Sequence, residues 1–190
     1  MKKYLSGILL FIVCFLFSGF VCASGFDVVP SELYSFPEEG DFPPVLNVGE
    51  VIECGNYSFR ILYQPVFSKS FQAMIANKDL KYLMMRVGIT NNSEDTVGWI
   101  SHDSFQLQEI FRNQIFGTYK LDYLMSAKAA SGFSWKAFYS PIAPGETLQT
   151  LLVFTVFQEL DDWIFSFSPH MLGENPVETI QFRVPKVIVQ

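Results

Sequence analysis

The chain has 190 residues, of which 49% are hydrophobic and 16% aromatic, and its formal net charge is −6. This composition is too apolar for a disordered chain, and the length suits one domain once a targeting segment is removed. The net charge argues against a nucleic-acid-binding protein, whose affinity comes from basic residues, and against electrostatic docking on anionic lipid.

The first residues have the pattern of a secretory signal peptide. Two lysines precede an uninterrupted apolar run, Ile8–Phe17, and small residues follow at the −3 and −1 positions of a cleavage site, Val21-Cys22-Ala23. We therefore predict a signal peptide over residues 1–23, cleaved between Ala23 and Ser24. A secreted or cell-surface location follows from this prediction.

Two other interpretations of this segment remain open. Residues 4–23 are long enough to span a bilayer, so an uncleaved N-terminal helix could tether the protein to a membrane. Lipidation at Cys22 is a weaker alternative, because Phe20 and Val21 before it make a poor lipobox. Membrane association is expected only if this segment is retained.

Residues 24–45 are predicted to form an acidic, proline-rich linker. Its segment Phe36–Pro44 reads FPEEGDFPP. Proline removes hydrogen-bond donors from a strand ladder, and neighbouring carboxylates repel one another, so an extended conformation is favoured.

Residues 46–190 show short strand-like segments separated by turn residues. No helices alternate with them, so we predict an all-β fold, an antiparallel β-sandwich. Pro185 lies inside the last segment and places it at a sheet edge. The segments are Gly49–Cys54, Tyr57–Val66, Tyr82–Ile89, a strand from Phe105 through Glu109, Ile115–Tyr119, Leu148–Phe157, Trp163–Phe167 and Thr179–Ile188.

The segment Tyr119–Tyr139 departs from the strand pattern. Leu121, Leu124, Met125 and Lys128 have helical spacing, and the pattern breaks at Ser131-Gly132. We predict one short helical or irregular crossover here.

The same region is the most aromatic part of the chain. Rings on loops at one end of a sandwich can form a platform for a partner. We predict that Tyr119, Tyr123, Trp135 and Tyr139 contact a partner, with Trp135 and Tyr139 the most exposed. The alternative is a second small core beneath the crossover. The cluster comprises Phe111, Phe116, Tyr119, Tyr123, Phe133, Trp135, Phe138 and Tyr139.

Few residues suggest chemistry. His102-Asp103 could serve a hydrolase-type enzyme, although neighbours in a strand point to opposite faces. A soft copper site around His170-Met171, with methionines from other strands, and an acidic cation site are weaker hypotheses. We expect no catalytic residue, no metal site and no cofactor. The methionines are Met84, Met85 and Met125, and the acidic residues are Glu159, Asp161 and Asp162.

Cys54 is the only cysteine that remains after the predicted cleavage. A single cysteine cannot form an internal disulfide, so the fold does not depend on one. A buried, inert thiol is expected at this strand end, and intermolecular pairing stays open.

Three segments together resemble a known family. The Asn-rich turn Thr90–Asp95, the segment Ser104–Phe116 and the Pro-Gly-Glu turn leading into a strand, Ile142–Val156, are similar to secreted bacterial immunoglobulin-like domains of unknown function. These domains are common in extracellular proteins and lipoproteins of Gram-positive bacteria and are similar in topology to the mycobacterial immunoprotective antigen. The corresponding residues here are Asn91, Asn92, Phe105, Leu107, Glu109, Pro144, Gly145, Glu146 and Phe154.

The resemblance covers residues 46–187 and implies an immunoglobulin-like sandwich. It implies no activity, because its motifs are structural. Our leading hypothesis is an exported, non-enzymatic binding module whose partner is an unknown extracellular protein or glycan. The alternatives are a cell-envelope structural protein tethered by the N-terminal helix, and a hydrolase that uses His102 and Asp103.

Overall fold

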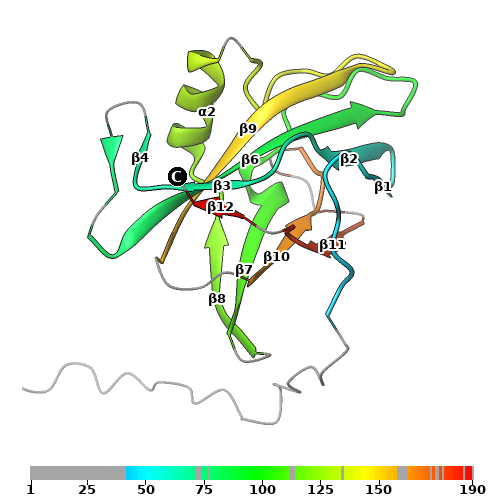
Figure 1. Ribbon diagram of the computed structural model, residues 1–190. Coiled ribbons are helices and arrows are strands. Elements are labelled where there is room, and N and C mark those ends of the chain that lie inside the picture. The colour runs from blue at the N-terminus through cyan, green and yellow to red at the C-terminus, as the bar shows by residue number, and fades with distance from the viewer. Residues whose placement is uncertain are drawn as a thin grey trace, which may run out of the picture. The chain divides into compact units, whose positions relative to one another are not determined.

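Two β-sheets pack face to face, and one helix lies over the outer face of the larger sheet (Figure 1). The computed structural model describes residues 42–189, apart from residues 72–73, 77, 112–113, 134, 158–161, 172, 174–175, 177 and 186. The predicted signal peptide, its cleavage site at Ala23 and Ser24, and residues 24–41 of the predicted linker lie outside the described residues.

The larger sheet is organised around β6, its long central strand. β9 runs antiparallel to β6 along one side, from the Leu80–Phe157 pair to the Thr90–Thr147 pair. β2 and β3 share the other side of β6, end to end, and β1 and β12 pair outside them. The six strands are β1 (Val51–Cys54), β2 (Tyr57–Ile61), β3 (Val66–Ser68), β6 (Leu80–Asn91), β9 (Thr147–Phe157) and β12 (Ile188–Val189).

The smaller sheet has the strand order β11-β10-β7-β8, all antiparallel, with a register shift in β7 between Glu109 and Ile110. A separate short hairpin, β4 with β5, precedes β6. The bounds are β4 (Ser70–Phe71), β5 (Met74–Ile75), β7 (Phe105–Phe111), β8 (Gln114–Lys120), β10 (Asp162–Phe167) and β11 (Ile180–Arg183).

The predicted fold class, a mostly antiparallel sandwich with one helical crossover, is confirmed. Two of the predicted strands are interrupted at prolines. The segment predicted as one strand over 57–66 stops at Ile61 and resumes at Val66, because Pro65 has no N–H to donate to the ladder.

The last predicted strand is likewise divided, and its two halves belong to different sheets. β11 ends at Arg183, Val184 donates to the carbonyl of Trp163, and after Pro185 the chain crosses to β12 beside β3. Both halves lie at sheet edges, as Pro185 indicated. The β12–β3 pair and the Val45–Arg183 bridge are parallel, which the expectation of antiparallel pairing missed.

Phenylalanine side chains fill the space between the sheets. Phe59 of β2 lies 5.3 Å from Phe165 and 5.1 Å from Phe167, measured between ring centroids. Phe165 also contacts Phe182 at 5.2 Å and Phe154 at 6.1 Å. Alternate residues of each strand point into this layer, and all five rings are buried.

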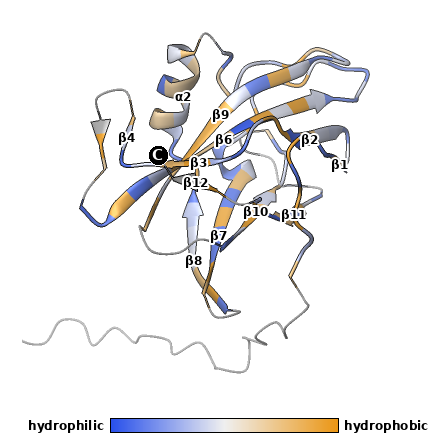
Figure 2. Ribbon diagram, in the orientation of Figure 1, coloured by the Kyte–Doolittle hydropathy of each residue, from blue (hydrophilic) through white to orange (hydrophobic). Residues whose placement is uncertain are grey.

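The helix α2 (Tyr123–Gly132) explains why β6 is apolar on both faces. Its small buried residues Ser126, Ala129 and Ala130 let it lie close to β9 and β6 (Figure 2). Leu124, which the helical spacing placed with the apolar residues, is instead 75% exposed. The second core cluster beneath α2 contains Phe71, Tyr82, Met125, Ala129, Leu151 and Val153.

Cys54 is fully buried, and burial raises the pKa of its thiol to about 11. A thiol with so high a pKa carries almost no thiolate at neutral pH, so it is a poor nucleophile in the folded protein. The burial of Cys54 expected from the sequence is confirmed. Among the described helices, none is long and apolar enough to cross a membrane.

Replacing Phe165 should test the aromatic layer. Phe165→Ala leaves a cavity among four neighbouring rings, and we expect the free energy of unfolding in urea to fall by about 3–5 kcal/mol. Phe116→Ala is the matched control, because Phe116 is 68% exposed and its loss should change stability by about 0.5 kcal/mol or less. Equal losses in the two variants would contradict this assignment of the core.

Candidate functional site

A buried asparagine positions the loops at one end of the sandwich. Asn91 ends β6 and is fully buried, and its side-chain amide donates to the carbonyls of Asp95 at 2.7 Å and Ile142 at 3.0 Å. Its side-chain oxygen accepts from the backbone N–H of Ser93 at 2.9 Å. One side chain therefore closes the turn after β6 and holds it to the loop before β9.

The held loop carries an exposed tryptophan. Val97 and Ile142 exchange two backbone hydrogen bonds of 3.0 Å, which fix the chain just before Trp99 against the loop that contains Tyr139. Trp99 is 63% exposed, and its ring lies 6.0 Å from that of Tyr139.

Tyr139 and Tyr123 complete a row of three rings, which we call the aromatic platform (Trp99, Tyr123 and Tyr139). The two tyrosine rings stack at 5.4 Å with an interplanar angle of 21°. Desolvation, together with the hydrogen bond to the hydroxyl of Tyr139, raises the pKa of Tyr123. Tyr123 is 44% exposed.

The platform is anchored to the core from below. Buried Phe138 packs edge-on against Tyr123 at 5.7 Å and Tyr139 at 5.2 Å, and it contacts core residue Phe105 at 5.7 Å. Asp122 caps α2 by accepting from the N–H of Met125 at 3.1 Å, so Tyr123 begins the helix in a fixed place. The rings are thus preorganised.

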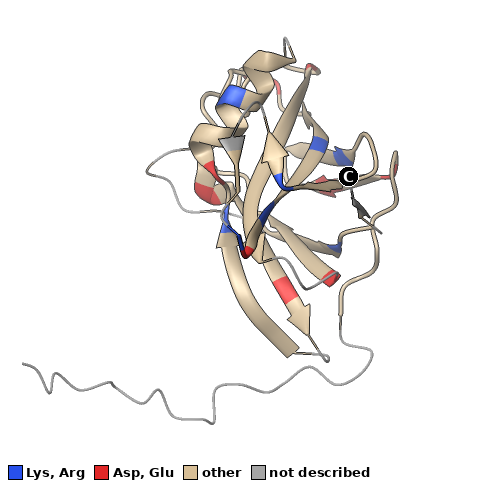
Figure 3. Ribbon diagram, turned by 60° about the vertical axis from the view of Figure 1, so that its left-hand side comes forward, with Lys and Arg blue, Asp and Glu red and all other residues tan. Residues whose placement is uncertain are grey.

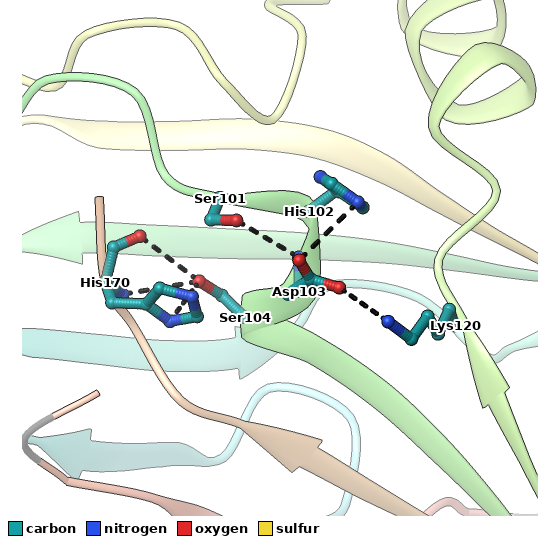
Figure 4. A network of polar contacts seen from close by, with 6 residues as sticks. All are labelled: Ser101, His102, Asp103, Ser104, Lys120 and His170. Carbon is teal, nitrogen blue, oxygen red and sulfur yellow. Dashed lines mark hydrogen bonds and ion pairs between the residues drawn. The ribbon is translucent and has the colours of Figure 1, made fainter. Parts of the chain in front are cut away.

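Polar side chains border the platform. His102, whose ring lies 6.2 Å from that of Tyr123, is in the short 3-10 turn η2 (His102–Ser104). Asp103 accepts from Lys120 at 3.1 Å and lies 3.7 Å from Nε2 of His102 (Figure 4). The Lys120 hydrogen bond, with the nearby histidines, lowers the pKa of Asp103. The border therefore offers an ionised carboxylate, an ammonium group and an imidazole.

Charged groups do not dominate this region. In the view of Figure 3, basic and acidic residues are scattered over the domain without a continuous basic stripe. Stacking on aromatic faces and hydrogen bonding at the platform border are therefore the interactions that this surface supports best.

The four aromatic residues predicted to bind a partner lie in three places. Tyr123 and Tyr139 are neighbours in the platform, and Tyr139 is half-buried. Trp135, also half-buried, lies on the guanidinium of Arg86 with Phe133. The aromatic segment is therefore divided between a surface platform and packing on the larger sheet.

Tyr119 is part of the packed interior. Its hydroxyl donates to the buried carboxyl of Glu109 at 2.5 Å, and its ring lies 5.8 Å from that of Trp163. Trp99 was not among the predicted site residues, because this tryptophan lies well before the dense aromatic segment. The only local signal was a large ring beside Gly98 in a stretch that follows a turn.

The two residues of the hydrolase hypothesis, His102 and Asp103, lie in the turn η2 and not in a strand, and their side chains approach to 3.7 Å, so the expectation that they point to opposite faces is wrong. The neighbouring pair Ser104 and His170 does not form a nucleophile with its base. Ser104 is buried, and its hydroxyl lies 3.1 Å from Nδ1 of His170 (Figure 4). That nitrogen is 2.6 Å from the carbonyl of Ser168, which can only accept, so Nδ1 carries the proton and cannot take one from Ser104. Asp103 contacts His102 and Lys120 instead.

The proposed metal ligands are dispersed. Met85 lies in the main core, whereas Met125 is a residue of α2 and belongs to the second cluster, with Met84 packed against it. Asp162 is paired with Arg183, at 2.5 Å, whereas residues 159 and 161 lie outside the described residues. Within the described part of the chain, no three His, Cys, Asp or Glu side chains form a group able to hold a metal ion.

No family model and no curated protein matches the sequence. Solved structures similar in fold include a candidate lipoprotein from Staphylococcus aureus, with 17% identity, 76% of this chain and 95% of that chain covered, and a TM-score of 0.49. An uncharacterized β-sandwich protein from Clostridium difficile has 13% identity, coverages of 78% and 99%, and a TM-score of 0.42.

A candidate lipoprotein from Bacillus subtilis is also similar, with 13% identity over 72% of this chain and a TM-score of 0.49. The present chain spans 38% of the length of that protein. The sandwich assignment itself follows from the strand pairing described above.

Glu109 should make the protein less stable as the pH rises. A carboxylate in an ion pair has the opposite effect, because its stabilising contribution is lost as the pH falls. Burial raises its pKa above the usual 4.5, so the folded state favours the protonated form. This stabilisation is complete below pH 4.5 and is lost as the pH rises. We expect the unfolding free energy of the wild type, minus that of Glu109→Gln, to decrease from acidic to neutral pH in urea titrations.

Glu146→Gln provides a control of opposite sign. The ion pair with Lys136 and the N–H of Ala143 lower the pKa of Glu146, so its contribution is present above the unfolded pKa and lost on acidification. The same slope in both comparisons would contradict the role assigned to Glu109.

Proposed function

We propose that this protein is an exported, non-enzymatic binding module that recognises a glycan through the aromatic platform. The observation that carries the proposal is the exposure of Trp99 and Tyr123, at 63% and 44%, on a rigid base of buried Phe138. The three rings are contiguous, and a contiguous exposed apolar patch, unlike a single exposed ring, is typical of an interaction site.

The chemistry of a glycan suits this surface. The C–H face of a sugar ring packs on aromatic faces, and its hydroxyls take hydrogen bonds from groups at the edge. The carboxylate of Asp103 and the ammonium of Lys120 stand at that edge and offer both kinds of partner. A protein–protein interface usually has a larger apolar core than three rings provide, so a glycan fits this surface better than an extracellular protein does.

Export is supported by the signal-peptide pattern of residues 1–23 and by the resemblance of three segments to secreted bacterial immunoglobulin-like domains. The contact of His102 with the ring of Tyr123, and the pairing of Asp103 with Lys120, favour a role for these residues at the border of a binding surface. The tethered envelope protein differs from the secreted one only in the fate of residues 1–23.

The location can be tested by intact mass and N-terminal sequencing of the protein from culture medium and membranes. We expect a chain that begins at Ser24 in the medium. A full-length chain found in the membrane fraction would instead establish the tethered form. A lipid mass on Cys22 would overturn the predicted cleavage site.

Binding can be tested by sedimentation of the purified protein with insoluble peptidoglycan, chitin and cellulose. We expect retention by at least one of these glycans, and a dissociation constant that rises about threefold to tenfold in Trp99→Ala and in Tyr139→Ala. The control is Phe116→Ala, which removes an exposed ring outside the platform and should bind as the wild type does.

Two results would contradict the platform. Equal weakening by Phe116→Ala would indicate nonspecific adhesion of exposed rings. Retention unaffected by the loss of both Trp99 and Tyr139, in variants that keep the wild-type circular dichroism spectrum, would place the binding surface elsewhere.

A further inference from the structure

A hollow lies on the outer face of the larger sheet, and none of its lining residues belongs to the aromatic platform. Its volume is about 480 Å³, which is in the range of small-ligand sites. Its walls come from the β2–β3 connection, β4, the centre of β6 and the segment after α2. These four segments are distant in sequence, and the sheet brings them together.

Arg86 occupies the centre of this hollow. The β6 register places it opposite Leu151 on the outer face, and its guanidinium lies over three rings at 5.1–5.2 Å from their centroids. The rings belong to Tyr63, Phe133 and Trp135. Cation–π contact of this kind engages the flat faces of a guanidinium.

Among the described residues, no hydrogen-bond acceptor is paired with the guanidinium of Arg86. The contacts that the described residues make with its guanidinium are those of the three rings, and none of the ion pairs among the described residues includes Arg86. None of the described residues that line the hollow is acidic. A half-buried arginine with five donors, held in place by rings and lacking a counter-charge, is arranged to meet an anion.

We propose that this hollow binds an organic carboxylate that carries an apolar body. The edge of the guanidinium matches the two oxygens of a carboxylate, and a bidentate pair is the strongest form of this contact. Phe71, Met84 and Leu151 line the hollow and accept the apolar part. A phosphate dianion would find only one cation among the described lining residues, so a single negative charge fits better.

The test uses the full mature protein and n-octanoate as the probe, with isothermal titration calorimetry as the readout. Octanol and octylammonium, which have the same chain without the negative charge, are the matched comparison ligands. We expect octanoate to bind and the other two to bind at least tenfold more weakly, because a charge-assisted hydrogen bond contributes roughly that factor.

Arg86→Gln should weaken octanoate binding about tenfold to hundredfold and leave octanol unchanged. Arg86→Lys keeps the charge and removes the planar fork, so we expect intermediate affinity and an intact fold. The indole N–H signal of Trp135 in ¹⁵N NMR spectra should shift on titration, whereas that of Trp99 should not. Trp99→Ala is the control variant and should bind octanoate as the wild type does.

Several results would overturn the proposal. Equal affinity for octanoate and octanol would show an apolar hollow without anion recognition, and tighter binding of octyl phosphate would assign a different anion. No heat and no Trp135 shift at the highest soluble octanoate concentration, or wild-type affinity in a folded Arg86→Gln variant, would show that Arg86 only packs against its rings.

Discussion

The contact between Phe59 and the phenylalanines of β10 holds the two sheets together, and the rest of the domain depends on it. Phe59 comes from the larger sheet and meets Phe165 and Phe167 of the smaller one. Because these rings have no polar group to satisfy, they can pack in a continuous layer. Through Phe105 and Phe138 the same layer reaches the surface, where it supports the aromatic platform.

Buried polar groups add selectivity to this apolar interior. The side-chain amide of Asn91 donates to the carbonyls of Asp95 and Ile142, which lie in two different loops. These two hydrogen bonds determine which loops meet. Glu109 is satisfied at only one carboxyl oxygen, and the N–H of Trp163, its cross-strand neighbour, has no partner among the described residues. Burying a polar group costs free energy, and the cost remains where an atom has no hydrogen-bond partner. At Asn91 the hydrogen bonds to the two loops offset this cost.

Much of the fold could be predicted because its signals are local. Alternation in Phe105 and Leu107 indicated a strand, and the Pro144-Gly145 turn needs the positive φ of 70° that glycine adopts readily. Pro185 indicated that the last strand lies at a sheet edge. What local patterns could not predict was the crossing of the chain between sheets after Pro185, since pairing partners are set by packing far along the chain.

The candidate sites were harder to predict for the same reason. The density of aromatic residues indicated the region around α2 as a candidate site. It could not distinguish Tyr119, whose side chain faces the core, from Tyr139, which lies at the surface. Trp99 joins the platform through the Val97–Ile142 bridge, and Tyr63 joins Arg86 through the sheet. Neither association leaves a pattern within one segment.

The path of the chain at its described ends has a mechanical consequence. The N–H of Leu46 donates to the carbonyl of Arg183, and the N–H of Arg183 donates to the carbonyl of Pro44. These two hydrogen bonds form a short clasp, and β12 follows Arg183 by only a few residues. Tension applied between Val45 and Val189 therefore runs through this short clasp and along the covalent chain across Pro185. The clasp would open first, at low force, and the phenylalanine layer would be loaded only after it had yielded.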